Sequence, residues 1–143
     1  MKSSTIYFFE DKFYIHADCK TTVGVWVLCP PIYEASKDNL EELGRSVLGA
    51  LQASKDNVTH PVDFKVLSTP LLSSAQVKSW NAFAKKALCL NIEEIDDLII
   101  LIPTKNFGQK GGYRPLVDER RIFKEISPFE LGEAVLASIA VCE

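Results

Sequence analysis

The stretch Thr5-Ile6-Tyr7-Phe8-Phe9-Glu10-Asp11-Lys12-Phe13-Tyr14-Ile15-His16-Ala17 sets the fold class of this chain. It contains two runs of aromatic and β-branched residues, which favour β-strands, separated by three charged residues. The pattern predicts a hairpin with strands over residues 5–9 and 13–17. The turn lacks the Asn-Gly or Asp-Gly pair that is typical of two-residue hairpin loops.

Further strands are predicted after this hairpin. In Thr22–Cys29, apolar residues occupy both alternating sets, which predicts a strand in the middle of a sheet. Pro30-Pro31 is expected to end it, because proline supplies no N–H to a ladder. The other strand-like runs are Asp63–Leu67, Leu88–Ile92, Leu98–Ile102 and Arg121–Ile126.

Two helices are predicted in the middle of the chain. The first follows Asp38, which forms a capping-box pattern with Glu41 three residues later. Its apolar residues recur at helical spacing at Leu40, Leu43, Val47 and Leu51. The second is predicted to begin at Ser73, which forms the same pattern with Gln76. Its inward residues are Val77, Trp80, Ala84 and Leu88.

A third helix has the clearest boundary in the sequence. Ser127 can cap it, Pro128 occupies its first position, and Glu130 completes a capping box. The segments 42–48 and 130–136 match at Glu, Leu, Gly, Val and Leu. A helix-interior glycine costs about 1 kcal/mol relative to alanine, so the match indicates a shared packing demand, namely close approach of each helix to the sheet. Coincidence between two amphipathic helices is the alternative.

Length and composition predict one globular domain. The 143 residues are 47% hydrophobic and 24% charged, which is typical of a folded chain that needs no disulfide scaffold. We therefore expect a single α+β domain over residues 1–143, with a largely antiparallel or mixed central β-sheet packed by about three amphipathic helices.

The chain shows no sign of membrane insertion or secretion. Its longest apolar run is Leu98–Ile102, far short of the ~20 residues that span a bilayer. Met1–Thr5 leads directly into strand-like residues rather than a signal-peptide core. We therefore expect a cytoplasmic protein in which scattered cysteines are small core residues rather than metal ligands or disulfides. These cysteines are Cys19, Cys29, Cys89 and Cys142.

Catalytic motifs are not found, and no cofactor or metal is expected. His16 lies in a predicted strand, where a structural role is favoured, and His60 is expected to be exposed in a polar turn. There is no Gly-x-Ser-x-Gly nucleophile elbow. The loop Gly108–Gly112 lacks the Gly-Lys-Ser/Thr of a phosphate-binding loop. It is a flexible connection by default, although such a loop can also contact a partner.

Acidic clusters are the most informative charged feature. Glu93, Glu94, Asp96 and Asp97 lie within five positions, and Asp118-Glu119 form a second group. The net charge of −3 disfavours binding to nucleic acid, which needs a concentrated basic face. Solvated surface is the plain interpretation of both clusters. Among specific roles, steering of a basic protein partner is favoured over metal binding.

Several segments together resemble the CdiI immunity proteins of bacterial contact-dependent growth inhibition (CDI) systems. The resemblance runs from Gly24 to the end of the chain and consists of core and loop positions rather than a catalytic signature. The segments are Gly24-Val25-Trp26-Val27, Leu43-Gly44 with Val47, Val77-Lys78-Ser79-Trp80, Gly111-Gly112-Tyr113-Arg114-Pro115-Leu116 and Glu130-Leu131-Gly132-Glu133-Ala134-Val135.

This resemblance implies a small cytosolic protein that is not an enzyme and that neutralises the C-terminal toxin domain of a cognate CdiA effector by covering its active site or substrate face. Such toxins are often nucleases. A monomer or weak oligomer is expected. The family's toxin-facing surfaces diverge, so the contact residues are instead predicted from exposed acids and the glycine-rich loop: Glu93, Glu94, Asp96, Asp97, Lys110, Tyr113, Arg114, Asp118 and Glu119. The alternative is a small cytosolic nuclease or hydrolase that uses Asp96, Asp97 or Glu119.

Overall fold

The computed structural model describes residues 1–143 and contains a seven-stranded sheet in which every strand pair is antiparallel. The strand order is β3-β2-β1-β4-β5-β6, and β7 pairs with β5 beside β6. The strands are β1 Lys2–Phe9, β2 Lys12–Lys20, β3 Trp26–Ser36, β4 Leu88–Ile95, β5 Leu98–Asn106, β6 Tyr113–Pro115 and β7 Arg121–Lys124. The helices are α1 Leu40–Ala53, α2 Thr69–Ala75, α3 Trp80–Ala84, α4 Gly108–Gly111 and α5 Pro128–Val141, with short 3-10 turns η1 Phe64–Ser68 and η2 Val117–Glu119. The predicted α+β fold is confirmed.

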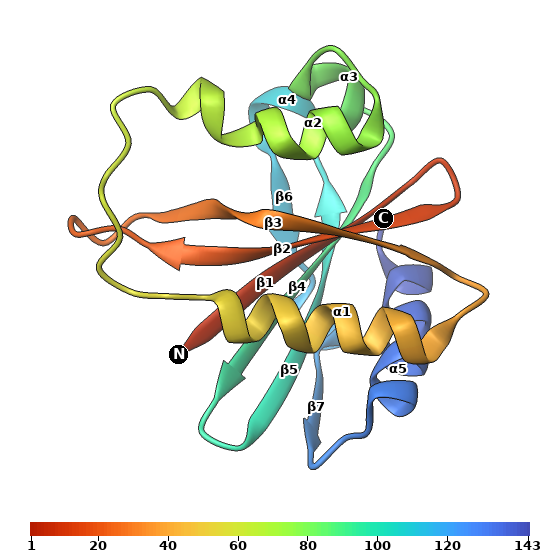
Figure 1. The fold of residues 1–143 in the computed structure, drawn as a ribbon. Helices are drawn as coiled ribbons and strands as arrows, with labels where there is room; N and C mark the ends of the chain where they lie inside the picture. Colours follow the sequence, from red (N-terminus) through yellow and green to blue (C-terminus); the bar gives the residue numbers. More distant parts are fainter.

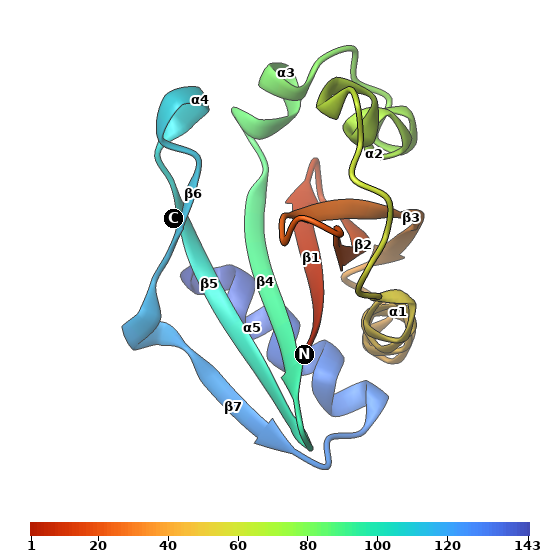
Figure 2. The ribbon, with the colours of Figure 1, turned by 90° about the vertical axis from the view of Figure 1, so that its left-hand side faces the viewer.

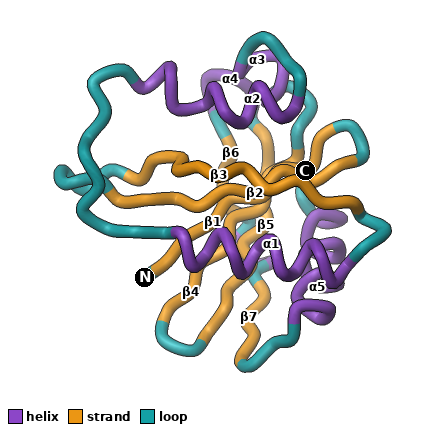
Figure 3. Tube along the Cα trace, viewed as in Figure 1, coloured by secondary structure: helices purple, strands orange, loops and turns teal.

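Helices pack on both faces of this sheet (Figure 1, Figure 3). Strand alternation sends one set of side chains toward α1 and α5. These strand residues and the facing helix residues form the larger core, which includes Ile6, Phe13, Leu43, Leu90, Leu101 and Leu131. The other set meets α2 and α3 in a smaller core that includes Tyr7, Tyr14, Leu71, Phe83 and Cys89. Helices α2 and α3 lie at one end of this second face (Figure 2). The remainder of that face is therefore not covered by a helix.

The β1–β2 hairpin forms as predicted, with both strands longer than expected. Phe9 pairs with Lys12 at the end of the hairpin, and Phe8 pairs with Phe13 one position before it. Glu10 and Asp11 make the turn, and both have positive φ, at 48° and 68°. These angles are those of a type I′ turn, which suits the twist of paired strands even without glycine.

Strand β3 differs from its prediction. It begins at Trp26, runs through the cis-linked Pro30-Pro31 to Ser36, and lies at the edge of the sheet rather than in its middle. An edge strand has a single neighbour, so a residue without an N–H is tolerated there. Cys29 pairs with Ala17 and Tyr33 pairs with Ile15, so the two prolines fall in an irregular stretch opposite a single residue of β2.

The structure corrects the predicted boundaries of the two helices in the middle of the chain. Asn39, not Asp38, caps α1: its Oδ1 accepts a hydrogen bond from the Glu42 N–H at 3.1 Å. Ser73 lies inside α2, which ends at Gln76 in a left-handed conformation. Ser79 then caps the separate helix α3. The predicted single helix is thus two short ones.

Two further segments also differ from prediction. Residues 63–67 are not a strand; Asp63 caps the 3-10 turn η1 by accepting from the Lys65 N–H. The glycine-rich loop contains the short helix α4 before β6 begins at Tyr113. By contrast, α5 begins with the predicted capping box of Ser127 and Glu130. The matched glycines, Gly44 and Gly132, face the opposing helix rather than the sheet.

Candidate partner-binding surface

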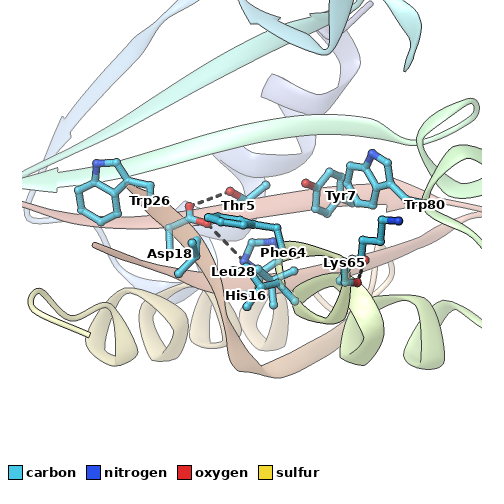
Figure 4. Close-up of a pocket in the computed structure, with 12 residues that line it drawn as sticks. Thr5, Tyr7, His16, Asp18, Trp26, Leu28, Phe64, Lys65 and Trp80 are labelled. Carbon is cyan, nitrogen blue, oxygen red and sulfur yellow. Dashed lines mark hydrogen bonds and ion pairs between the residues drawn. The ribbon is translucent and has the colours of Figure 1, made fainter. Parts of the chain in front are cut away.

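A hollow of about 470 Å³ lies on the second face of the sheet, between β1–β3 and the segment from η1 to α3 (Figure 4). Its side chains come from five separate elements. Because β1, β2 and β3 are antiparallel neighbours, alternate residues of each regular stretch point to this face. Thr5 lies opposite His16, and Asp18 lies opposite Leu28. The hollow is therefore a product of sheet register rather than of any local motif.

Aromatic side chains surround this hollow and remain partly exposed. Trp26 is 36% exposed, Phe64 49% and Trp80 37%. The Trp80 ring meets the buried Tyr7 ring edge-on with centroids 5.8 Å apart, and Phe83 packs beneath at 5.1 Å from Tyr7. Exposed aromatic residues are enriched at protein–protein interfaces. This part of the surface thus has the composition of a contact site.

Asp18 provides the one carboxylate in the hollow. Its Oδ2 accepts hydrogen bonds from Thr5 Oγ1 at 2.8 Å and from Ser3 Oγ at 3.1 Å. The Oδ1 atom of Asp18 lies 3.4 Å from His16 Nδ1, and this is the only contact of Asp18 with a basic side chain within the chain. The Asp18 side chain is 16% exposed. The carboxylate is therefore fixed in place, open on one side, and not paired with a lysine or arginine.

His16 is buried, as its strand position predicted, but only one of its ring nitrogens has a partner. Nδ1 lies 2.9 Å from the Ala17 carbonyl oxygen. Because a carbonyl oxygen can only accept, Nδ1 carries the proton and Nε2 is left with a lone pair. Nε2 is buried and has no hydrogen-bond partner. Burial lowers the pKa of His16, and the nearby Asp18 opposes this shift.

The second histidine and the cysteines are mainly structural. His60 is partly buried rather than exposed, with Nδ1 3.2 Å from Thr21 Oγ1. All four cysteines are unpaired thiols. Burial raises the pKa of Cys29 to about 12 and also raises the pKa of Cys89. These two thiols are protonated near neutral pH, which is unfavourable for nucleophilic attack.

The predicted contact residues of the glycine-rich segment lie at the end of the sheet near α3. Tyr113 is partly buried and its hydroxyl donates to the Ala87 carbonyl at 2.8 Å, so this side chain supports β6. Burial raises the pKa of Tyr113. Arg114 is exposed, with its Cζ 4.6 Å from the Phe107 ring centroid, and Lys110 is exposed on α4. Arg114 and Lys110 are therefore the members of this group free to meet a partner.

The predicted acidic residues lie elsewhere. Glu93 and Glu94 belong to β4, opposite Ser3 and Lys2, while Asp96 and Asp97 form the exposed β4–β5 turn. Leu98 and Lys105 are seven positions apart on β5, which corresponds to roughly 24 Å at about 3.4 Å per residue, and Lys105 pairs with Arg114 of β6. The β4–β5 turn and α4 are thus at opposite ends of β5 and form no single patch.

The second acidic pair, Asp118 and Glu119, is exposed in η2 between β6 and β7. It is not adjacent to the β4–β5 turn, where β7 ends at Lys124 opposite Leu98. No three His, Cys, Asp or Glu side chains converge in an arrangement suited to a metal ion. None of the helices combines the length and the apolar character needed to cross a membrane. Nothing in this geometry assembles the carboxylates into a shared site.

Sequence reasoning did not identify the hollow. Its residues come from positions 5–28 and 64–80, and no local pattern links them. The alternation of Thr5 with Tyr7, and of His16 with Asp18, was visible in the hairpin and pointed to one shared face. The placement of Trp26 beside them depends on how β3 pairs with β2, which no local sequence pattern specifies.

Comparisons with known proteins agree on the fold. A structure described as a protein of unknown function, NMB0488, from Neisseria meningitidis matches with a TM-score of 0.80 and 16% identity, covering 99% of this chain and 95% of the other. A chain of the CdiA-CT/CdiI toxin and immunity complex from Yersinia pseudotuberculosis matches with a TM-score of 0.79 and 16% identity, covering 99% and 97%. No curated protein matches the sequence. The model of the CdiI family, CDI immunity protein, matches residues 5–142, so this chain belongs to the family of CDI immunity proteins.

Proposed function

We propose that this protein binds the C-terminal toxin domain of a cognate CdiA effector and neutralises it. The observation that carries this proposal is the family match over residues 5–142, which includes both cores and the hollow. The fold shared with a chain of the Yersinia toxin and immunity complex supports it. We place the neutralisation in the cytoplasm, where an immunity protein meets an incoming toxin.

The proposed mechanism is steric, and the chain itself makes and breaks no bonds. A partly exposed aromatic hollow on a rigid sheet offers apolar area for burial, and polar groups around it provide specificity. Binding there, extended by one of the exposed acidic or basic groups, would cover the toxin's active site or its substrate face. The β4–β5 turn, η2 and α4 lie apart, so a compact interface uses some of these groups and not all.

We propose further that the toxin is a nuclease. This protein carries a net charge of −3 and exposes two acidic groups, at Asp96-Asp97 and at Asp118-Glu119. A protein that binds nucleic acid needs a basic surface, and acidic side chains complement such a surface. Degradation of purified RNA and DNA by the toxin domain, with and without this protein, tests this part separately.

Co-expression tests the central proposal. The C-terminal domain of the CdiA-type effector encoded beside this gene is induced in cells with and without this protein, and growth is followed. We expect growth arrest that this protein relieves, together with a stable 1:1 complex by light scattering. The toxin domain of an unrelated CDI system serves as the control and should not be neutralised. Failure to relieve arrest, with no complex formed, would contradict the proposal.

A further inference from the structure

The wall of the hollow formed by Asp18 and His16 presents the Asp18 carboxylate to the open side, while the His16 ring is buried behind it. Asp18 Oδ1 accepts from neither hydroxyl donor, since Thr5 and Ser3 both bond to Oδ2, and its nearest contact is His16 Nδ1 at 3.4 Å. The proton of His16 Nδ1 points toward the Ala17 carbonyl, which leaves the Nε2 lone pair unpaired. An unpaired buried acceptor is unfavourable. The accessible part of this wall is therefore a carboxylate, which is complementary to a group that only donates.

This wall is also negatively charged and lies next to aromatic surface. Asp18 has no lysine or arginine partner within the chain, and His16 is held in its neutral form by burial. Trp26 lies on the same sheet face, two residues from the Leu28 that pairs with Asp18. Phe64 lines the hollow from η1. A carboxylate beside an indole and a phenyl ring favours a cation, through ion pairing and cation–π contact.

The hollow has two chemically different ends. Figure 4 shows Trp26 and Trp80 at its opposite ends, with Asp18 toward Trp26 and Lys65 toward Trp80. The positive charge of Lys65 therefore stands away from the carboxylate. The volume of the hollow, about 470 Å³, falls in the range of roughly 300–1,000 Å³ found for ligand pockets. A long side chain therefore has room to enter.

We propose that the Asp18 end of the hollow receives the guanidinium group of an arginine from the toxin. This inference rests on the proposed function and names the chemistry of its contact. A guanidinium is planar, carries five N–H donors and no acceptor, and stacks on aromatic rings. It thus matches the Asp18 carboxylate and the neighbouring rings of Trp26 and Phe64 together. A lysine ammonium would satisfy the charge but would not stack in the same way.

The test compares the affinity of the toxin domain for the wild-type protein and for Asp18→Asn. Asparagine keeps the shape of the side chain and an oxygen that accepts from Thr5 and Ser3, so the fold is retained; thermal unfolding checks this. We expect a Kd about tenfold or more weaker, because removing one partner of a desolvated charged pair is costly. Glu133→Gln on α5, an exposed residue on the far face of the sheet, is the matched control and should bind as wild type.

An arginine scan of the toxin domain identifies the other half of the contact. Each arginine is changed to alanine and to lysine and measured against wild type and Asp18→Asn in a double-mutant cycle. We expect one arginine whose loss has an effect only when Asp18 is present, with lysine restoring little. Coupling to no arginine, or an Asp18→Asn variant that binds as tightly as wild type, would overturn this inference and leave the proposed function standing. No binding by the wild-type protein would overturn both.

Discussion

Gly44 of α1 and Gly132 of α5 lie reciprocally at the crossing of the two helices. A Cβ at Gly44 would overlap the carbonyl oxygen of Pro128 in α5, and a Cβ at Gly132 would overlap the carbonyl oxygen of Leu40 in α1. Each helix thus presents its glycine to the first turn of the other. This symmetry explains why both helices carry glycine at the matched position: the close approach is between the two helices, and not between each helix and the sheet.

Replacing either glycine with alanine should destabilise the protein. Alanine favours a helix by about 1 kcal/mol over glycine, but here its methyl group would collide with backbone, which cannot move alone. Overpacking costs about 1–3 kcal/mol, so we expect a net loss of up to about 2 kcal/mol in the free energy of unfolding for each variant. Urea unfolding measures this.

Gly49 of the same helix is the control. A Cβ there would lie 3.1 Å from the Tyr33 hydroxyl, which is the end of a side chain and can shift. Gly49→Ala should therefore be near neutral. The double variant of Gly44 and Gly132 should lose less than the sum of the single losses, because separating the helices once accommodates both methyl groups. Unchanged stability in both single variants would contradict the close crossing.

The β1–β2 turn provides a stabilising prediction. Glu10 has a φ of 48° and no ion pair, so its side chain contributes strain without a compensating contact. Asparagine is favoured at the first central position of a type I′ turn. We expect Glu10→Asn to raise the free energy of unfolding by about 0.5 kcal/mol. Glu10→Val introduces a β-branched residue that avoids positive φ and should lower the free energy of unfolding. A Val variant more stable than the Asn variant in urea unfolding would exclude this turn geometry.

Sequence patterns predicted the parts of the fold that depend on local periodicity. The hairpin, β4 and β5 were found from short runs of aromatic, β-branched and other apolar residues, and α5 from its capping box. The course of β3 was not found, because the rule that prolines end strands holds for central strands and β3 is at the edge. The break between α2 and α3 was missed because Gln76 adopts a left-handed conformation without being glycine.

The candidate site was less accessible to sequence reasoning than the fold. Charged clusters such as Asp96-Asp97 are visible because their members are neighbours in the chain. The hollow joins Asp18 to Phe64 and Trp80 across three elements, and such a contact depends on tertiary packing. Which exposed group meets the toxin also depends on the shape of the toxin, and this chain does not encode that shape.

His16 should make stability depend on pH. Its folded-state pKa is lowered by burial, so below about pH 6.5 the unfolded chain takes up a proton that the folded chain refuses. The unfolding free energy therefore falls as the pH drops from 6.5 toward the folded-state pKa, and this contribution is absent above 6.5. His16→Asn keeps an N–H donor near the Nδ1 position and cannot titrate. Urea unfolding between pH 7.5 and 5.5 should show a shallower decline for this variant, and an equal decline would remove His16 as the cause.

The acidic groups can be separated by their effect on association with the toxin. Reversing charge at Asp96 and Asp97 should slow association several-fold, roughly 3–10-fold, and flatten its dependence on salt if this turn steers the toxin. The same change at Asp118 and Glu119 alters the net charge equally at a distant position, so it controls for charge alone. Stopped-flow association at low and high salt measures both variants. Because these side chains are exposed and screened, the dissociation rate should change little. If a variant associates with wild-type kinetics, its acidic pair does not belong to the steering surface.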